Sequence, residues 1–168
     1  MITRDWAMTM ARYNAWQNAA IYRAAGGLTD AARRADRGAF FGSIHGTLSH
    51  LLWADHMWLS RFADRPRPET SQADSAAYEP DWDRLSARRG ETDGALSAWA
   101  AGMTPEDLAH EYRWQSGSTG REETRPMALI VTHVFNHQAH HRGQVHAMLT
   151  AAGARPEATD LFVMPVAA

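Results

Sequence analysis

The chain has no cysteine and no lysine among its 168 residues. Without cysteine it can form neither a disulfide, nor a thiolate metal site, nor a cysteine nucleophile, so a bound metal must use nitrogen and oxygen ligands. Without lysine, Schiff-base catalysis and a lysine-bearing phosphate loop are excluded. Any thiol that takes part in a reaction must therefore come from another molecule.

The sequence also lacks an excess of basic charge and a long apolar run. Its 17 arginines are balanced by 19 acidic residues, which gives a formal net charge of -2. A nucleic-acid partner requires a basic surface, and none is indicated. No segment reaches the roughly 18 apolar residues of a membrane span or resembles a signal peptide. We therefore expect a cytoplasmic protein that binds neither nucleic acid nor membrane.

The composition is that of a globular protein, with 45% apolar residues, 21% charged residues and seven tryptophans. A chain of this length suits one hydrophobic core. No internal repeat and no low-complexity segment divides it. We predict a single domain over residues 1–168.

Apolar residues at three- and four-residue steps predict four helices in one all-α bundle. The helices are expected at residues 3–25, 42–63, 81–102 and 126–152. Residues 28–41 form a connection with one short helical turn, and residues 64–80 form a long polar loop rich in proline and serine. Residues 111–125 are typical of a short hairpin before the last helix.

Five of the nine histidines lie within residues 132–146. On a helix, His137 and His141 are one turn apart and fall within the apolar stripe, whereas His133 and His140 lie at its edge and His146 points away. A buried imidazole without a partner costs roughly 1 to 3 kcal/mol, and one metal ion would satisfy both rings. Hydrogen bonds to the backbone or to a carboxylate would satisfy them as well. As a metal site the pair is incomplete, because a third ligand should come from another helix.

The helix at 42–63 offers three further histidines. His45 and His56 border its leucine face, whereas His50 lies on the opposite side with Trp53 and Met57. Helical periodicity alone therefore favours His45 over His50 as the third ligand. The run His-Gln-Ala-His-His lacks the glutamate of the His-Glu-x-x-His protease motif and the Glu-x-x-His pairs of di-iron bundles.

Three segments of the sequence resemble the DinB/YfiT-like family of bacterial four-helix bundles with a mononuclear metal site. They are residues 13–18 (YNAWQN), 45–55 (HGTLSHLLWAD) and 136–144 (NHQAHHRGQ). The resemblance implies that the ligands are His50, His137 and His141, with His45 as the backup candidate. It also implies zinc or nickel as the metal and favours a homodimer.

The resemblance further implies chemistry with a low-molecular-weight thiol. We expect a thiol-dependent S-transferase acting on small electrophiles, in which the metal presents a thiolate. Two alternatives are a metal-assisted hydrolase and a non-enzymatic, stress-related metal-binding module with a structural ion. Near the site, Asp55 is the candidate acceptor that orients an imidazole and Gln144 lies near the histidine face. Trp53 and Tyr13 are candidates for the lining of an apolar pocket.

Overall fold

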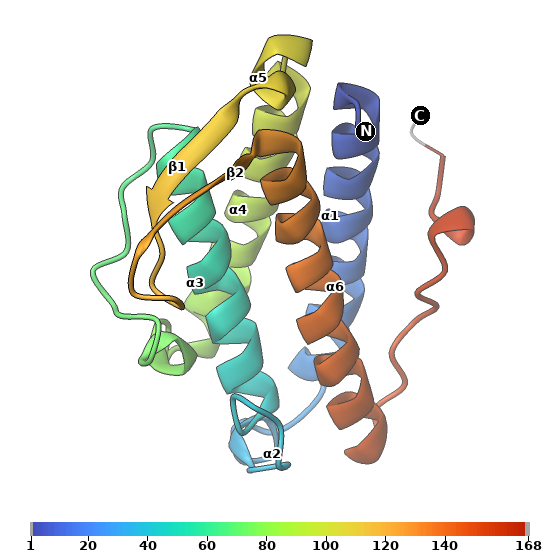
Figure 1. The fold of residues 1–168 in the computed structure, drawn as a ribbon. Helices are drawn as coiled ribbons and strands as arrows, with labels where there is room; N and C mark the ends of the chain where they lie inside the picture. Colours follow the sequence, from blue (N-terminus) through green and yellow to red (C-terminus); the bar gives the residue numbers. More distant parts are fainter. Residues whose placement is uncertain (1, 167–168) are drawn as a thin grey trace.

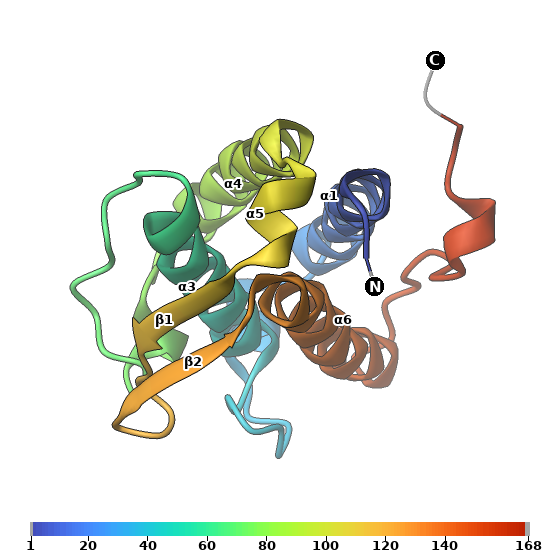
Figure 2. The same ribbon diagram turned by 45° about the horizontal axis from the view of Figure 1, so that its top comes forward.

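Four long helices form the body of the protein in the computed structural model, which describes residues 2–166. They are α1 (Arg4–Gly26), α3 (Ile44–Phe62), α4 (Trp82–Gly102) and α6 (Met127–Ala151). Helices α1 and α3 each pack against α4 and α6, so the four form a bundle (Figures 1 and 2). The prediction of an all-α four-helix bundle is confirmed. Within residues 2–166, no helix is both long and apolar enough to cross a bilayer.

Short polar side chains begin three of the long helices. The hydroxyls of Thr3 and Ser43 accept hydrogen bonds from the backbone N–H groups of the first turns of α1 and α3. The carboxylate of Asp81 does the same for α4. Such caps satisfy backbone donors that have no partner within the helix. Gly90 and Gly94 lie at exposed positions in the middle of α4 and do not interrupt it.

Smaller elements connect the long helices. They are α2 (Asp30–Arg34), the 3-10 turn η1 (Ser75–Ala77), α5 (Pro105–Ala109), the strands β1 (Glu111–Gln115) and β2 (Glu122–Pro126), and the 3-10 turn η2 (Leu161–Val163). The two strands pair antiparallel, with Glu111 opposite Pro126. The predicted hairpin and the short helical turn within residues 28–41 are both present, whereas η1, α5 and η2 were not predicted.

The segment after α6 returns along the outside of α1 (Figure 1). Side chains of α1 hold it: Gln17 donates to the carbonyl of Ala158 at 3.0 Å, and Arg23 pairs with Glu157 at 3.0 Å. This segment therefore covers the α1 side of the bundle, away from α3.

The core contains three apolar clusters, and a polar layer separates the two larger ones. One cluster is built around Leu48, Leu52 and Leu149, and the other around Ala7, Val131 and Phe135. Every long helix contributes to the layer, whose members are Asn14, Asn18, Asp55, Arg89, Asp93, Gln138 and Arg142; all of them are buried.

Hydrogen bonds and ion pairs connect the polar layer across the bundle. The guanidinium of Arg89 lies 2.7 Å from the carboxylate of Asp55 and 2.8 Å from that of Asp93. Asn18 donates to Asp93 at 2.9 Å, and Gln138 donates to Asp55. Buried charges are tolerated when they are paired in this way.

Candidate metal centre

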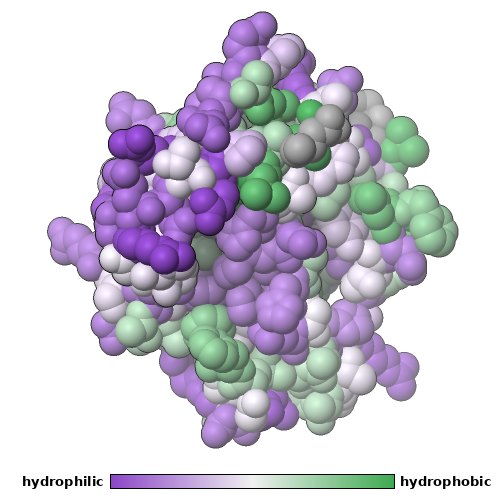
Figure 3. Space-filling view, in the orientation of Figure 1, coloured by the Kyte–Doolittle hydropathy of each residue, from purple (hydrophilic) through white to green (hydrophobic). Residues whose placement is uncertain are grey.

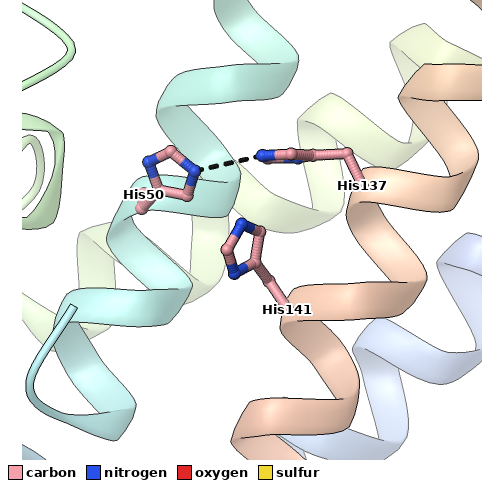
Figure 4. A group of neighbouring side chains, drawn as sticks. All are labelled: His50, His137 and His141. Carbon is pink, nitrogen blue, oxygen red and sulfur yellow. Dashed lines mark hydrogen bonds between the residues drawn. The ribbon is translucent and has the colours of Figure 1, made fainter. Parts of the chain in front are cut away.

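Three histidines from α3 and α6 point toward one another in the bundle (Figure 4). His50, His137 and His141 each offer a ligand atom, and these atoms all lie within 4.8 Å of one another. Nε2 of His50 is 3.3 Å from Nε2 of His137. Two nitrogens on one tetrahedral ion, each at about 2.05 Å from it, would be roughly 3.3 Å apart. The spacing of this pair fits a divalent metal ion.

A serine from the loop after α3 determines the orientation of the His50 ring. Nδ1 of His50 lies 2.8 Å from Oγ of Ser75. The Ser75 hydroxyl donates its proton to the carbonyl of Gln72 at 2.7 Å, so its oxygen accepts the Nδ1–H of His50. A proton on Nδ1 leaves the lone pair on Nε2, the atom that faces His137.

Gln144 holds the His141 ring in the same manner. Its amide nitrogen lies 3.2 Å from Nε2 of His140, and its carbonyl oxygen lies 2.7 Å from Nδ1 of His141. The oxygen can only accept, so Nδ1 of His141 carries the proton and Nε2 carries the lone pair. Two of the three rings thus have the tautomer that binds a metal through Nε2.

Burial keeps the three imidazoles neutral. Burial, with a smaller contribution from the nearby His141 ring, lowers the pKa of both His50 and His137 to about 3. Burial also lowers the pKa of His141, against a raising effect of its hydrogen bond to Gln144. Since a metal binds only the neutral imidazole, the donors are ready at physiological pH without losing a proton first.

An aromatic ring from the turn before α3 covers the histidines. The Phe41 ring stacks on His50 with the centroids 3.8 Å apart, and it lies 5.3 Å from the His141 ring. This packing depends on Gly46 in the first turn of α3, since a Cβ there would lie 2.5 Å from the Phe41 carbonyl oxygen. No sequence pattern indicated Phe41, because it lies in an irregular connection without periodicity.

A cavity of about 1130 Å³ opens beside the histidines, between α3, α6, the loop at 64–74 and the hairpin. His50 and His137 both line it, so the centre is accessible from this side. The space-filling view shows a hollow left of centre on the face that carries the hairpin, with mainly hydrophilic residues around it (Figure 3). Trp53 lines the cavity as well, and its indole N–H donates to the carbonyl of Thr70 at 2.9 Å.

Three other histidines of α3 and α6 lie outside the three-histidine group and contact different residues. Nε2 of His45 lies 2.8 Å from the carbonyl oxygen of Glu79, which places this ring outside the three-histidine group. His56 contacts the hydroxyls of Tyr78 and Thr92 on the α4 side. His133 lines the cavity, where its ring meets the edge of Trp58, but it is not one of the three grouped histidines.

Asp55 and Tyr13 lie away from the ligand nitrogens. Asp55 belongs to the polar layer, where it pairs with Arg89 and accepts from Gln138, and burial raises its pKa. Within residues 2–166, no imidazole forms a hydrogen bond with Asp55. Ser75 fills the role expected of Asp55, because it orients the His50 ring. Tyr13 donates to the carbonyl of Thr159 in the segment after α6 and does not line the cavity.

Comparison with known proteins places nearly the whole chain in one family. The model of the DinB family matches residues 1–167. Protein DinB of Bacillus subtilis (strain 168) is 28% identical over 167 residues, which cover 93% of this chain and 91% of that protein. A search of solved structures found no significant match. The chain belongs to the DinB family.

Proposed function

We propose that this chain is a metal-dependent enzyme that transfers a low-molecular-weight thiol to small electrophiles. His50, His137 and His141 would hold zinc or nickel through neutral imidazole nitrogens. The observation that carries the proposal is the large cavity lined by two of these histidines. A purely structural ion needs no such opening, whereas a catalytic ion needs a free position that substrates can reach.

The surrounding residues support this chemistry. When bound, the ion lowers the pKa of a thiol and thereby supplies the nucleophilic thiolate. Ser75 and Gln144 hold the rings of His50 and His141 so that lone pairs face the centre. Phe41 covers one face of His50 and limits the access of water there. The thiol must come from a second molecule, because the chain has no cysteine.

Metal analysis of protein purified without a histidine tag tests the site itself. We expect one equivalent of zinc or nickel in the native protein and loss of tight binding in His137→Ala. His110→Ala is the matched control, since the exposed His110 lies outside the group. One equivalent of metal retained in His137→Ala would contradict the assignment of the ligands.

Kinetic assays test the reaction. The metal-loaded protein should convert members of an electrophile panel only when a thiol such as glutathione is present, and His141→Gln should lose this activity while His110→Gln retains it. Turnover without thiol would instead support a metal-assisted hydrolase. A structural ion in a stress-related binding module predicts no turnover at any metal occupancy, together with a lower melting temperature after metal removal.

We also propose that the protein acts as a homodimer in the cytoplasm. Exposed apolar side chains at Phe162 and Val163, near the end of the segment that follows α6, are compatible with a contact between copies. Light scattering should then give twice the chain mass of 18.7 kDa. The monomer mass at micromolar concentration would contradict the dimer.

A further inference from the structure

One face of α3 runs along the cavity from the metal centre to a guanidinium. His50, Trp53, Met57, Trp58 and Arg61 all line the cavity, at steps that keep them on one side of the helix. Arg61 follows His50 by eleven residues, which is about three turns and about 16 Å along the helix axis. The cavity therefore has a candidate reactive end at His50 and a cation at the far end of the same helix.

Arg61 has no acidic partner within residues 2–166, where ten other ion pairs occur. Its guanidinium lies 4.5 Å from the centre of the Trp58 ring, and its contact with the carbonyl of Gln115 is long, at 3.5 Å. The side chain is half-buried, and burial is the main cause that lowers its pKa. A guanidinium nevertheless stays charged in proteins, so this charge lacks a counterion.

The acidic residues of the cavity do not supply that counterion. Glu123 is already shared by two arginines, Arg121 at 3.1 Å and Arg125 at 2.8 Å. Glu69 is exposed on the loop at 64–74, and no ion pair connects it to Arg61. The exposed Arg67 lines the same cavity and adds positive charge. An anion that enters the cavity would therefore meet an uncompensated cation.

The walls between the two ends are aromatic. Trp53, Trp58 and Trp114 line the cavity, and the rings of Trp58 and Trp114 lie 6.0 Å apart at 61°. The Trp58 ring already packs on Arg61 and Phe62. Trp53 and Trp114 therefore offer the larger apolar contact area to a ligand. The lining thus matches an amphipathic ligand with an aromatic body and one acidic group.

We propose that the cavity takes an elongated acidic electrophile, with its carboxylate on Arg61, its aromatic body against the tryptophans and its reactive end at His50. The position of the reactive end rests on the proposed thiol transfer. A peptide thiol such as glutathione also carries carboxylates, but it has no apolar body for the tryptophan walls. The electrophile is therefore the partner that the lining favours.

Calorimetric titration of the full chain as purified tests the acid site without turnover. The probes are 6-(2-naphthyl)hexanoate and its primary amide, which share the naphthyl body and the chain and differ in the charge of the end group. We expect the carboxylate to bind at least about tenfold more tightly than the amide, as a charge-assisted hydrogen bond implies. Arg61→Gln should remove this preference, and Arg61→Lys should retain part of it. Arg113→Gln, which removes an exposed guanidinium paired with Glu122 on the hairpin, should behave like the native chain.

Equal affinities of the native chain for the two probes would overturn the proposal, and this comparison holds even where Arg61→Gln fails to fold. An unchanged preference in folded Arg61→Gln would overturn it as well. If glutathione displaces the naphthyl carboxylate from the native chain but not from Arg61→Gln, then Arg61 binds the thiol co-substrate. That outcome would reject the acidic electrophile. Since these titrations need neither thiol nor turnover, their failure is distinct from a failure of the thiol transfer.

Discussion

The hydroxyl of Ser75 lies 2.8 Å from Nδ1 of His50 and selects the nitrogen that this ring presents to the metal centre. Ser75 is buried in η1, which packs directly against α3. Its own proton is used on the carbonyl of Gln72, so its oxygen is left to accept from the imidazole. A residue outside the bundle helices thereby prepares a ligand within them.

Ser75→Ala should weaken zinc binding about 10- to 100-fold, the usual effect of removing a hydrogen bond that orients a metal-bound imidazole. Competition with a chromophoric chelator measures the affinity. Ser71→Ala is the control, since Ser71 lies in the same loop but bonds to Asp74. Equal zinc affinity in Ser75→Ala and the native protein would show that the His50 tautomer does not depend on Ser75.

Gly46→Ala should destabilise the fold by roughly 1 to 3 kcal/mol, because the added Cβ would press on the backbone of Phe41. The same shift should move Phe41 from His50 and weaken metal binding. Gly94→Ala is a matched change within a helix, where the added Cβ meets nothing within 4 Å. It should stabilise by about 0.4 to 1 kcal/mol. If urea denaturation shows a change in unfolding free energy of the same sign for both variants, the steric argument is wrong.

The free energy of unfolding of the metal-free protein should fall as the pH drops below about 6.5, the usual histidine pKa in an unfolded chain. Folding lowers the pKa of His50 and His137 to about 3, and that of His56 to about 4. Between these values the unfolded chain binds more protons than the folded one, so acid favours unfolding.

Chemical denaturation at a series of pH values between 7.5 and 5 measures this dependence. His137→Gln should reduce the slope, because one of the buried imidazoles is then absent. His110→Gln should keep the native slope, since His110 is exposed. A free energy of unfolding that stays constant over this range would contradict the burial of neutral imidazoles.

Arg89→Met should destabilise the protein by about 3 to 5 kcal/mol, because it leaves the carboxylates of Asp55 and Asp93 buried without their cation. Arg113→Met removes an exposed pair with Glu122 and should cost less than about 1 kcal/mol. Guanidinium denaturation compares the two. Similar losses of unfolding free energy in both variants would show that the ion pairs of the polar layer stabilise the fold no more than an exposed pair does.

The sequence was sufficient to predict the four long helices and the pairing of His137 with His141, but not what orients the imidazoles. Apolar periodicity located the four long helices, and the spacing of His137 and His141 indicated that they share a face. The choice of His50 over His45 needed the family resemblance, because periodicity assumes one buried face. In the structure α3 is buried nearly all round, by α4 and α6 on two sides and η1 on another.

Ser75 and Phe41 could not be predicted in the same way. Phe41 lies in an irregular connection and Ser75 in the short 3-10 turn η1. Both reach the site only after the chain has folded back on α3, so no local pattern marks them. Asp55, which follows His50 by five residues, was expected to orient an imidazole. That interval places it on another side of the helix, facing Arg89 and the polar layer.

The polar layer also restricts which amino-acid substitutions the protein can accept during evolution. Leucines above and below it can be exchanged for other apolar residues of similar volume, since a core tolerates substitutions that keep its total volume. A helix displaced by one turn would instead separate Arg89 from Asp55, or Gln138 from Asp55, and leave charge buried alone. Gln138 adjoins His137 along the chain, so the alignment of this layer also sets the height at which the α6 histidines meet His50. Residues of the apolar clusters can therefore be substituted during evolution while the imidazoles keep their positions.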